Sequence, residues 1–409
     1  MHILTRLNNT LRRYPSGIWI TMVIQAIRSM GFSIAFTYLP LYLYQQRGIS
    51  MTVVGLFFLV AGITAGVSQV LGGILADRFG HRKLFIVFLV MEILAFALLA
   101  VLVGIDGPIW SIYFTTSLVM IAGNMSAPAI SAIVADVSQD RTMTESYGLM
   151  AIGGNLGWAI GPLTGGYLQS LTSYAWVFGV GALVTAFSLI ALPHLPRDVH
   201  TPQEKEKNKA GFNIFLSDRN LVIFCVISML FFLEMAQWGS TLSVFTVDRV
   251  GFASEQYGLL MSVSGLLIIL FQFPISKQIE RLGFRLSLFL GCFFYGAGFL
   301  SFAWVRSFFP ALGSITLLVI GEMLFIPASY AVIGKISRLE DRAKSMGLLG
   351  LCGTVGNSFG PLLGGMLLDK FPFQPLWIWG PVSLPAFLAA VSFLLWRGYN
   401  RTRRKVNSP

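Results

Sequence analysis

The stretch Gly157–Gly166 reads GWAIGPLTGG, and 199 residues later Gly356–Gly365 reads GNSFGPLLGG. Each copy places Gly-x-x-x-Gly-Pro and a closing Gly-Gly pair inside an apolar segment. Small residues at this spacing let helices approach closely in lipid, and neighbouring helices can satisfy the carbonyl that a buried proline frees. The shared register predicts two homologous halves, the alternative being two unrelated glycine-rich helix contacts. The residues of the two copies are Gly157, Gly161, Pro162, Gly165, Gly166, Gly356, Gly360, Pro361, Gly364 and Gly365.

The composition is that of a polytopic membrane protein. Charged residues make up 11% of the 409-residue chain, against about 25% in soluble domains. Hydrophobic residues make up 55%, and many apolar runs approach the roughly 20 residues that a helix needs to span a bilayer. The run Ile18–Tyr44 exceeds a signal-peptide core of about 7–15 residues, so we expect it to remain as the first span.

Apolar runs and polar breaks predict an all-α membrane protein of twelve transmembrane helices in two pseudo-symmetric six-helix bundles. The expected spans are 17–45, 51–76, 84–104, 108–135, 145–170, 174–195, 219–247, 255–277, 284–305, 309–334, 344–369 and 375–396. The polar stretch 196–218 is interpreted as a cytoplasmic linker. It separates a bundle at 1–195 from a bundle at 219–409, which carries a basic cytoplasmic tail.

Membrane topology explains the net charge of +11 without a nucleic-acid partner. With both termini placed in the cytoplasm, the outer loops hold only Arg47, Arg249, Arg306 and Lys370, and Arg28 lies within a span. The other 24 of the 29 Lys and Arg residues lie inside. This asymmetry follows the positive-inside rule, so we expect a multi-pass protein of the cell (inner) membrane.

A second motif lies between the second and third expected spans and reads GILADRFGHRK, from Gly73 to Lys83. Here the chain resembles the major facilitator superfamily, whose loop at this place reads Gly-x-x-x-Asp-Arg-x-Gly-Arg-Arg. The matching residues are Gly73, Asp77, Arg78, Gly80 and Arg82, and His81 replaces a usual arginine. Residues 77–80 are echoed by Glu280–Gly283 at an offset of 203.

The resemblance covers nearly the whole chain and implies a rocker-switch transporter of the major facilitator fold. Its cytoplasmic loop would latch the outward-open state, with Asp77 as the latch carboxylate and Arg78 and Arg82 as its partners. A plain, positively charged turn is the alternative.

Gly157–Gly166 resembles the fifth-span motif of antiporters in that superfamily, especially the twelve-span drug:proton group. The resemblance implies a bendable packing seam between the two halves, although packing without any bearing on transport direction is an alternative. Many proton-coupled members also carry a fourth-span arginine within Leu-x-x-Arg-x-x-Gln-Gly. In the register of Gly123, this chain has Val119 at the arginine position and Ala122 at the glutamine position. The usual relay arginine is therefore absent.

Four ionisable residues lie well inside the expected spans, where charges are costly and usually face a cavity or a partner. Arg28, Glu234 and Glu322 lie on spans one, seven and ten, which the resemblance places around a central cavity. Glu92 lies on span three, at the expected periphery, and a structural role is predicted for it. We predict that Glu234 or Glu322 carries a coupling proton or binds a cationic substrate, with Arg28 as counter-charge. A purely structural pair of Arg28 and Glu234 is the rival interpretation.

Polar neighbours extend this candidate site. Gln25 lies three residues before Arg28, and Gln237 and Trp238 would share one helical face with Glu234. We interpret this face as the wall of a wet cavity and add Gln25, Gln237 and Trp238 to the substrate or coupling residues. Asn124 is added as well, with hydrogen bonding between helices as its alternative role.

The sequence carries no soluble catalytic constellation, no phosphate-binding loop and no metal-ligand spacing, so an enzyme or an ATP-driven pump is not predicted. We expect secondary active transport by alternating access, with a site near the midplane between the halves. The favoured function is proton-coupled export of small hydrophobic or cationic compounds by a monomer that uses the proton gradient and no cofactor. Uptake or exchange of a nutrient, peptide, sugar or organic anion is the alternative, and a non-transporting membrane receptor or scaffold is a third.

Overall fold

The computed structural model describes residues 14–138, 143–196, 218–337 and 342–396. Most of the predicted linker and the whole basic tail lie outside the described residues. Contacts between residues divide the chain into two compact units, each made of three segments. Unit 1 consists of Met1–Leu39, Thr64–Glu204 and Ala253–Ile269, and unit 2 consists of Pro40–Ile63, Lys205–Phe252 and Leu270–Pro409.

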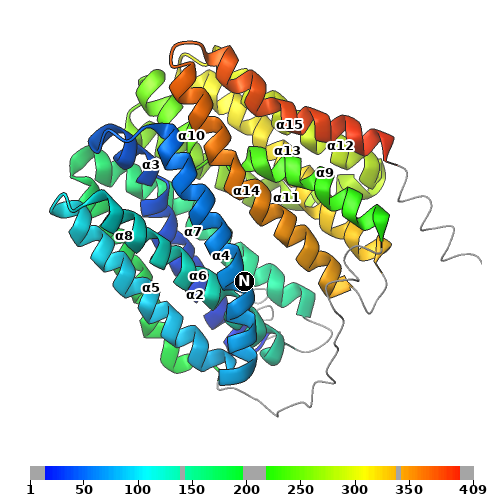
Figure 1. Cartoon of the computed structure of the whole chain (residues 1–409). Helices are drawn as coiled ribbons and strands as arrows, with labels where there is room; N and C mark the ends of the chain where they lie inside the picture. Colours follow the sequence, from blue (N-terminus) through cyan, green and yellow to red (C-terminus); the bar gives the residue numbers. More distant parts are fainter. Residues whose placement is uncertain (1–13, 139–142, 197–217, 338–341, 397–409) are drawn as a thin grey trace, which may run out of the picture. The chain divides into compact units, whose positions relative to one another are not determined.

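Unit 1 is built from helices that follow one another through short turns (Figure 1). They are α2 (Ser16–Phe36), the second part of α4 (Met51–Phe79), α5 (His81–Gly104), α6 (Ile109–Val137), α7 (Met143–Leu171), α8 (Tyr174–Ala191) and the first part of α11 (Ser254–Leu282). A buried apolar cluster joins α2, α4, α5 and α6, and its members include Ile24, Ala76, Phe85 and Ile130.

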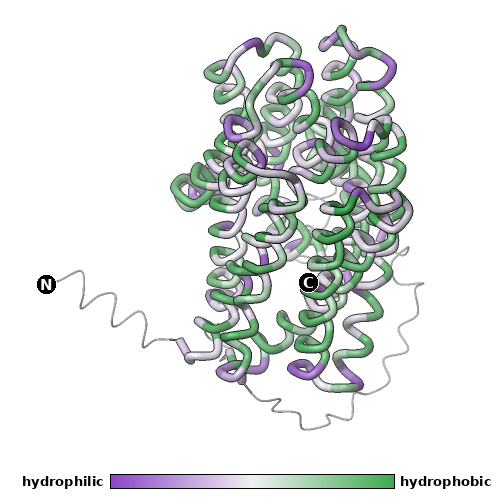
Figure 2. The backbone as a smooth tube through the Cα atoms, turned by 90° about the vertical axis from the view of Figure 1, so that its left-hand side faces the viewer, coloured by the Kyte–Doolittle hydropathy of each residue, from purple (hydrophilic) through white to green (hydrophobic). Residues whose placement is uncertain are grey.

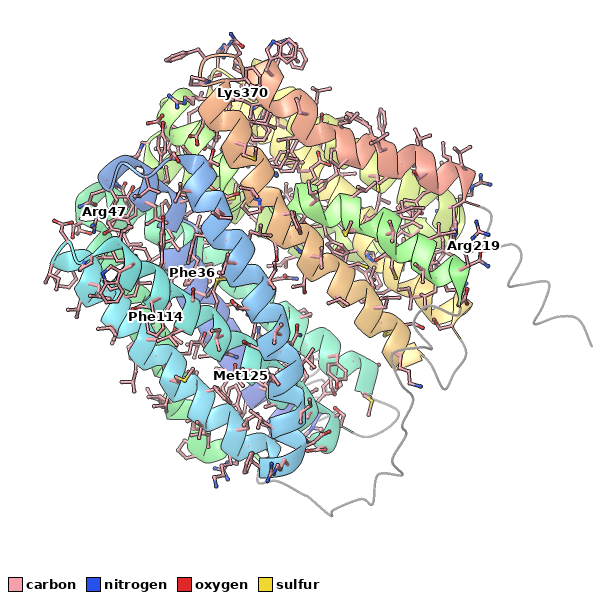
Figure 3. The ribbon with its side chains drawn as sticks, in the orientation of Figure 1. Phe36, Arg47, Phe114, Met125, Arg219 and Lys370 are labelled. Carbon is pink, nitrogen blue, oxygen red and sulfur yellow. The ribbon has the colours of Figure 1, made fainter. Side chains whose placement is uncertain are left out.

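Unit 2 repeats this plan. It holds the short α3 (Leu39–Leu41) except for its first residue, the first part of α4, α9 (Arg219–Met235), α10 (Thr241–Val244), the second part of α11, α12 (Phe284–Ser301), α13 (Phe308–Ile336), α14 (Arg342–Lys370) and α15 (Pro375–Leu395). Figure 3 labels Arg219 at the start of α9 and Lys370 at the end of α14.

Within the described residues, ten helices are long and apolar enough to cross a membrane. α7 and α9 are not among them, because seven glycines lower the mean hydropathy of α7 and α9 has only 17 residues. Figure 2 shows apolar residues along the helices and hydrophilic ones concentrated toward the turns. Large apolar side chains such as Phe114, which is 61% exposed, lie on the outside of the helices as a lipid-facing surface requires (Figure 3).

The helices α4 and α11 extend furthest past the predicted C-terminal ends of their spans. α4 continues to Phe79 and α11 to Leu282, although the expected spans end at 76 and 277. The polar last turns remain helical until Gly80 and Gly283, whose φ angles of 92° and 81° stop the helix and favour glycine. Hydropathy alone therefore ends these helices too early.

The helices of the first and seventh expected spans are each interrupted. α2 ends at Phe36 before α3 and a π-helical turn at Tyr42–Gln46, while α9 ends at Met235 before α10 and a π-helical turn at Phe245–Arg249. The interruptions at 37–38 and 236–240 are separated by the same 199 residues as the glycine motif, so they belong to the repeat. Interrupted helices are typical of the substrate sites of transporters.

In unit 1 the glycine motif holds α7 against α2. A Cβ atom added to Gly157 would lie 2.5 Å from the carbonyl oxygen of Ala26, and one added to Gly165 would lie 2.3 Å from that of Ile34. The prolines of the motif remain inside α7 and α14. Such backbone approaches leave no room for a larger residue.

In unit 2 the same motif holds α14 against α9. A Cβ atom added to Gly356 would lie 2.6 Å from the carbonyl oxygen of Met229, and one added to Gly360 would lie 2.3 Å from that of Leu233. The resemblance implied a seam between the sequence halves, but these four glycines contact helices of their own half. Gly166 and Gly365 do contact the other sequence half, because their Cβ atoms would lie 2.6 Å from the carbonyl oxygen of Ser254 on α11 and 2.1 Å from that of Met51 on α4.

Each unit also forms hydrogen bonds to the segment that comes from the other half of the sequence. In unit 1, Tyr38 donates its hydroxyl to the carbonyl of Pro162 at 2.7 Å and lies 3.2 Å from the carbonyl of Ser254. In unit 2, Asp369 accepts the backbone N–H groups of Met51 at 3.0 Å and Thr52 at 2.7 Å. The carboxylate thereby caps the N-terminus of α4, where unpaired N–H groups favour a negative charge.

Candidate functional site

A buried carboxyl group without a hydrogen-bond donor lies in unit 2. Glu234, in the last turn of α9, is 0% exposed. Within the described part of the chain, neither of its carboxylate oxygens has a hydrogen-bond partner. An isolated ionised carboxylate in such a place costs several kcal/mol. The group must therefore be neutral, or a cation must bind to it.

Trp238 does not lie on the helix that carries Glu234. The prediction placed Glu234, Gln237 and Trp238 on one continuous helical face, which is wrong because α9 ends at Met235 and the chain turns over Ala236–Ser240. The indole N–H of Trp238 donates to the hydroxyl of Tyr295 on α12, at 2.5 Å.

Glu322 lies on α13 and is partly buried. The residue before it, Gly321, packs directly on α12, because a Cβ atom there would lie 2.7 Å from the backbone nitrogen of Tyr295. The Tyr295 hydroxyl is in electrostatic contact with both Glu322 and Glu234. Two carboxyl groups from different helices therefore share one tyrosine as a neighbour.

Aromatic rings surround this site. Phe231 stacks on Phe325 with 3.8 Å between the ring centroids, and the Tyr295 ring lies 4.5 Å from that of Phe231. Phe299 contacts the same tyrosine edge-on at 5.5 Å. Rings beside a carboxyl group suit an organic cation, because the faces of aromatic rings attract positive charge.

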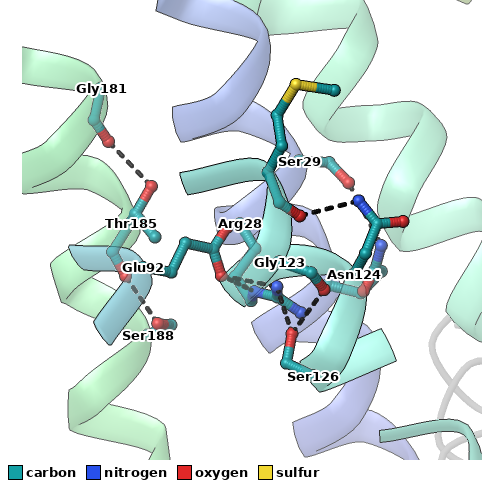
Figure 4. Close-up of polar contacts among 11 residues, drawn as sticks. Arg28, Ser29, Glu92, Gly123, Asn124, Ser126, Gly181, Thr185 and Ser188 are labelled. Carbon is teal, nitrogen blue, oxygen red and sulfur yellow. Dashed lines mark hydrogen bonds and ion pairs between the residues drawn. The ribbon is translucent and has the colours of Figure 1, made fainter. Parts of the chain in front are cut away.

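Unit 1 carries a second polar site, the ion pair of Arg28 and Glu92 (Figure 4). Nη2 and Nε of Arg28 donate to Oε2 of Glu92 at 2.6 and 3.2 Å, and Nη2 also donates to Ser126 at 2.7 Å. The guanidinium lies 5.6 Å from the ring centre of Phe85. Arg28 and Glu92 are only 8% and 4% exposed.

This geometry corrects two predictions. Arg28 was predicted as the counter-charge of Glu234, but its partner is Glu92, which lies in the same unit as Arg28. The rival interpretation, a structural pair of Arg28 and Glu234, is wrong for the same reason, whereas the burial of Glu92 in this pair fits the structural role predicted for it. The charge of Arg28 is thus neutralised within unit 1.

The remaining predicted polar residues form hydrogen bonds within a helix or between neighbouring segments. Gln237 donates to the carbonyl of Gly360 at 2.8 Å and accepts from Thr241, so its amide joins the turn after α9 to α14. Asn124 donates to the carbonyl of Met120 within α6, and Gln25 donates to Ser29 within α2. Figure 4 shows Asn124 and Ser29 in the surroundings of Arg28, whereas Gln237 lies in unit 2.

The loop motif forms a cluster of its own in unit 1. His81 lies 2.8 Å from a carboxylate oxygen of Asp136 and 3.8 Å from one of Asp77. Arg82 donates to the carbonyl of Leu192 at 3.2 Å. Arg78 lies over the ring of Phe79, with 5.3 Å between its guanidinium carbon and the ring centre.

Gly73 lies one helical turn before Asp77 and has space around it, with Pro128 3.9 Å from its Cβ position. His81 and Asp136 were not predicted as site residues. The departure of His81 from the family pattern was the available signal, because an imidazole can bridge two carboxylates where an arginine is usual. Within the described residues, no group of His, Cys, Asp and Glu has the arrangement of a metal site.

Comparison with known proteins agrees with this architecture. The sequence matches the model of the Major Facilitator Superfamily over residues 21–254 and again over 232–409. It is 23% identical over 369 residues to the uncharacterised MFS-type transporter YttB of Bacillus subtilis, covering 88% of this chain and 91% of that protein. It is also 23% identical to the quinolone resistance protein NorA of Staphylococcus aureus, covering 92% and 95% of the two chains.

Among solved structures, the fold is similar to that of a POT family transporter in complex with 5-aminolevulinic acid. The TM-score is 0.79 at 16% sequence identity, with 96% of this chain and 97% of that chain covered. At this identity the likeness establishes the shared fold.

Proposed function

Because the chain belongs to the Major Facilitator Superfamily and is a membrane transporter rather than an enzyme, we propose that it exports small hydrophobic or cationic organic compounds in exchange for protons. It does so as a monomer with twelve spans, α7 and the α9–α10 segment being added to the ten apolar helices. Both termini lie in the cytoplasm, and the proton gradient supplies the energy.

The observation that carries the proposal is the buried carboxyl group of Glu234. Because its oxygens have no donor among the described residues, the ionised group needs either a proton or a cation. These two ligands exclude one another at a single carboxyl group. Binding of the cation therefore releases the proton, and protonation releases the cation, which is the minimum requirement for antiport.

The surroundings support an organic cation as the cargo. Glu322 supplies a second carboxyl group, and the rings of Trp238, Phe231 and Tyr295 supply apolar and π-electron surface. Arg28 does not cancel this negative charge, because it is bound to Glu92. The name of NorA, a quinolone resistance protein, also favours export.

Uptake is the second candidate function. The structural neighbour bound to 5-aminolevulinic acid shows that a related fold holds a small polar metabolite, and the fourth-span arginine of many proton-coupled members is absent here. In either direction, the loop from Gly73 to Arg82 would latch one state of the cycle, with Asp77 and its neighbour His81 as the polar contacts that break and re-form.

Flux in proteoliposomes tests the proposal. Purified protein is reconstituted with a pH-sensitive dye inside, and ethidium or tetraphenylphosphonium is offered with and without an imposed proton gradient. We expect cation flux to move protons in the opposite direction. Glu234→Gln should abolish this exchange, whereas Asp106→Asn, which neutralises an exposed carboxylate in the turn between α5 and α6, should leave it intact.

Two results would contradict the proposal. Proton movement that no transported compound alters would rule out antiport. Normal coupling in both Glu234→Gln and Glu322→Gln would show that the site lies elsewhere.

A further inference from the structure

Tyr295 occupies the place in unit 2 that Glu92 occupies in unit 1. Gly80 and Gly283 precede α5 and α12 with the same positive φ, and they are 203 residues apart. The same offset relates Glu92 to Tyr295. A carboxylate in one unit is therefore replaced by a phenol in the other.

The helix that packs against this position repeats as well. At the offset of 199, Gly123 on α6 corresponds to Glu322 on α13. A Cβ atom added to Gly123 would lie 3.4 Å from Oε1 of Glu92. A side chain at this repeat position therefore points toward the group on the neighbouring helix, which in unit 2 is Tyr295.

The hydroxyl of Tyr295 has one proton left to give. Its oxygen accepts the indole N–H of Trp238, and within the described part of the chain its own O–H meets no acceptor. The side chain is 0% exposed, and the rings of Phe231 and Phe299 fix the phenol in place. A fixed donor without an acceptor, near a Glu234 carboxyl group that meets no donor among the described residues, is an incomplete hydrogen-bonding arrangement.

We infer that Tyr295 is a positioning residue whose O–H bonds to the carboxyl group of Glu322 when the Glu322 side chain turns toward it; in this structure the tyrosine oxygen accepts from Trp238 and its own proton is still available. The other groups that face it are Glu234 from α9 and Cys292, which lies one turn earlier on α12 in electrostatic contact with Glu234. The nearby amide of Gln272 on α11 is occupied by Ser276 and the carbonyl of Met323. Through this bond Tyr295 holds the Glu322 carboxyl group in the orientation that binds the proton or the transported cation. This role in transport rests on the proposed function.

Infrared spectroscopy tests the hydrogen bond without any transport assay. The full chain is purified in detergent at acidic pH, and the C=O band of the Glu322 carboxylic acid is identified as the band that Glu322→Gln removes. In Tyr295→Phe this band should move to higher wavenumber, because its C=O loses a donor. The control Tyr330→Phe, on α13 at a 46% exposed side chain, should leave the band unmoved.

Trp238→Phe is a second variant that keeps the tyrosine. Without the indole donor, the tyrosine O–H becomes a weaker donor, so the band should shift in the same direction by a smaller amount. If Tyr295→Phe does not fold, this variant decides alone. An unmoved Glu322 band in every folded variant of the two would overturn the inference.

The transport consequence is measured separately with tetraphenylphosphonium. Tyr295→Phe should raise the KM about tenfold, the usual effect of one hydrogen bond to a charged group. In a protein that already carries Glu322→Gln, adding Tyr295→Phe should change the KM by less than about twofold, because the acceptor of the hydrogen bond is already altered. If no cation is transported at all, the proposed function fails, while the infrared result still decides the role of Tyr295.

Discussion

Replacing Glu92 by glutamine should destabilise the protein by about 3 kcal/mol, at the lower end of the range for breaking a buried ion pair. The magnitude follows from the geometry, because Oε2 of Glu92 accepts from two nitrogen atoms of Arg28 and both side chains are less than 10% exposed. The amide of glutamine keeps an oxygen acceptor but leaves the guanidinium charge without a counter-charge. Ser126 alone cannot replace it, since a hydroxyl carries no charge.

The assay is a double-mutant cycle on unfolding free energy. Unfolding by denaturant in mild detergent is followed by tryptophan fluorescence for Arg28→Met, Glu92→Leu and the double variant that combines them, with Glu92→Gln measured beside the cycle. We expect the double variant to lie within about 1 kcal/mol of the original protein, because apolar side chains of similar size replace a buried pair at little cost. Ser126 then keeps its bond to the carbonyl of Gly123.

Glu234→Gln provides the contrast. This carboxyl group has no donor to lose, so its replacement should leave the unfolding free energy unchanged or slightly raised. Additive losses in the cycle, or a loss in Glu234→Gln as large as that in Glu92→Gln, would refute the assignment of Glu92 as the partner of Arg28.

Two further predictions concern the helix contacts. Gly161→Ala should lower the unfolding free energy by about 1–3 kcal/mol, because the new Cβ would lie 1.9 Å from the hydroxyl of Ser33. The control is Gly148→Ala on the same helix, where the new Cβ would meet no atom within 4 Å, and it should raise the unfolding free energy by about 0.5–1 kcal/mol. Equal effects at both positions would contradict the close contact at Gly161. Asp369→Ala should lower the unfolding free energy by about 0.5–2 kcal/mol, because α4 loses the cap on the N–H of Thr52. If high salt lowers the unfolding free energy of the original protein by the same amount, the effect is general electrostatics and not a cap.

Much of the fold is predictable because lipid imposes a simple requirement on the sequence. Each apolar run must form a helix to satisfy its own backbone, so hydropathy finds the helices. Hydropathy does not find the interruptions at 37–38 and 236–240, because it reports the mean apolar character of a window and not the backbone conformation of the few residues within it. Those breaks depend on side chains such as Tyr38, which bonds to the backbone of α7.

The candidate site is predictable only in part. The cost of burying charge singles out Glu234 and Glu322 from the sequence alone. It does not select the partner of Arg28, because the choice between Glu92 and Glu234 depends on which helices pack together. The sequence does not mark Tyr295 as a site residue, because a tyrosine within an apolar run is common in membrane helices. Only the comparison of repeat positions 92 and 295, with the structure to confirm the helix register, identifies it.

The two segments that the compact units exchange have an evolutionary consequence. Met51, at the start of α4, and Ser254, at the start of α11, are 203 residues apart, and each begins a helix whose first part packs in the unit of the opposite sequence half. Reciprocal exchange of equivalent segments is the contact pattern of a two-fold symmetric dimer. A single ancestral repeat with this sequence pattern would have been able to pair with a second copy of itself before gene fusion joined the two.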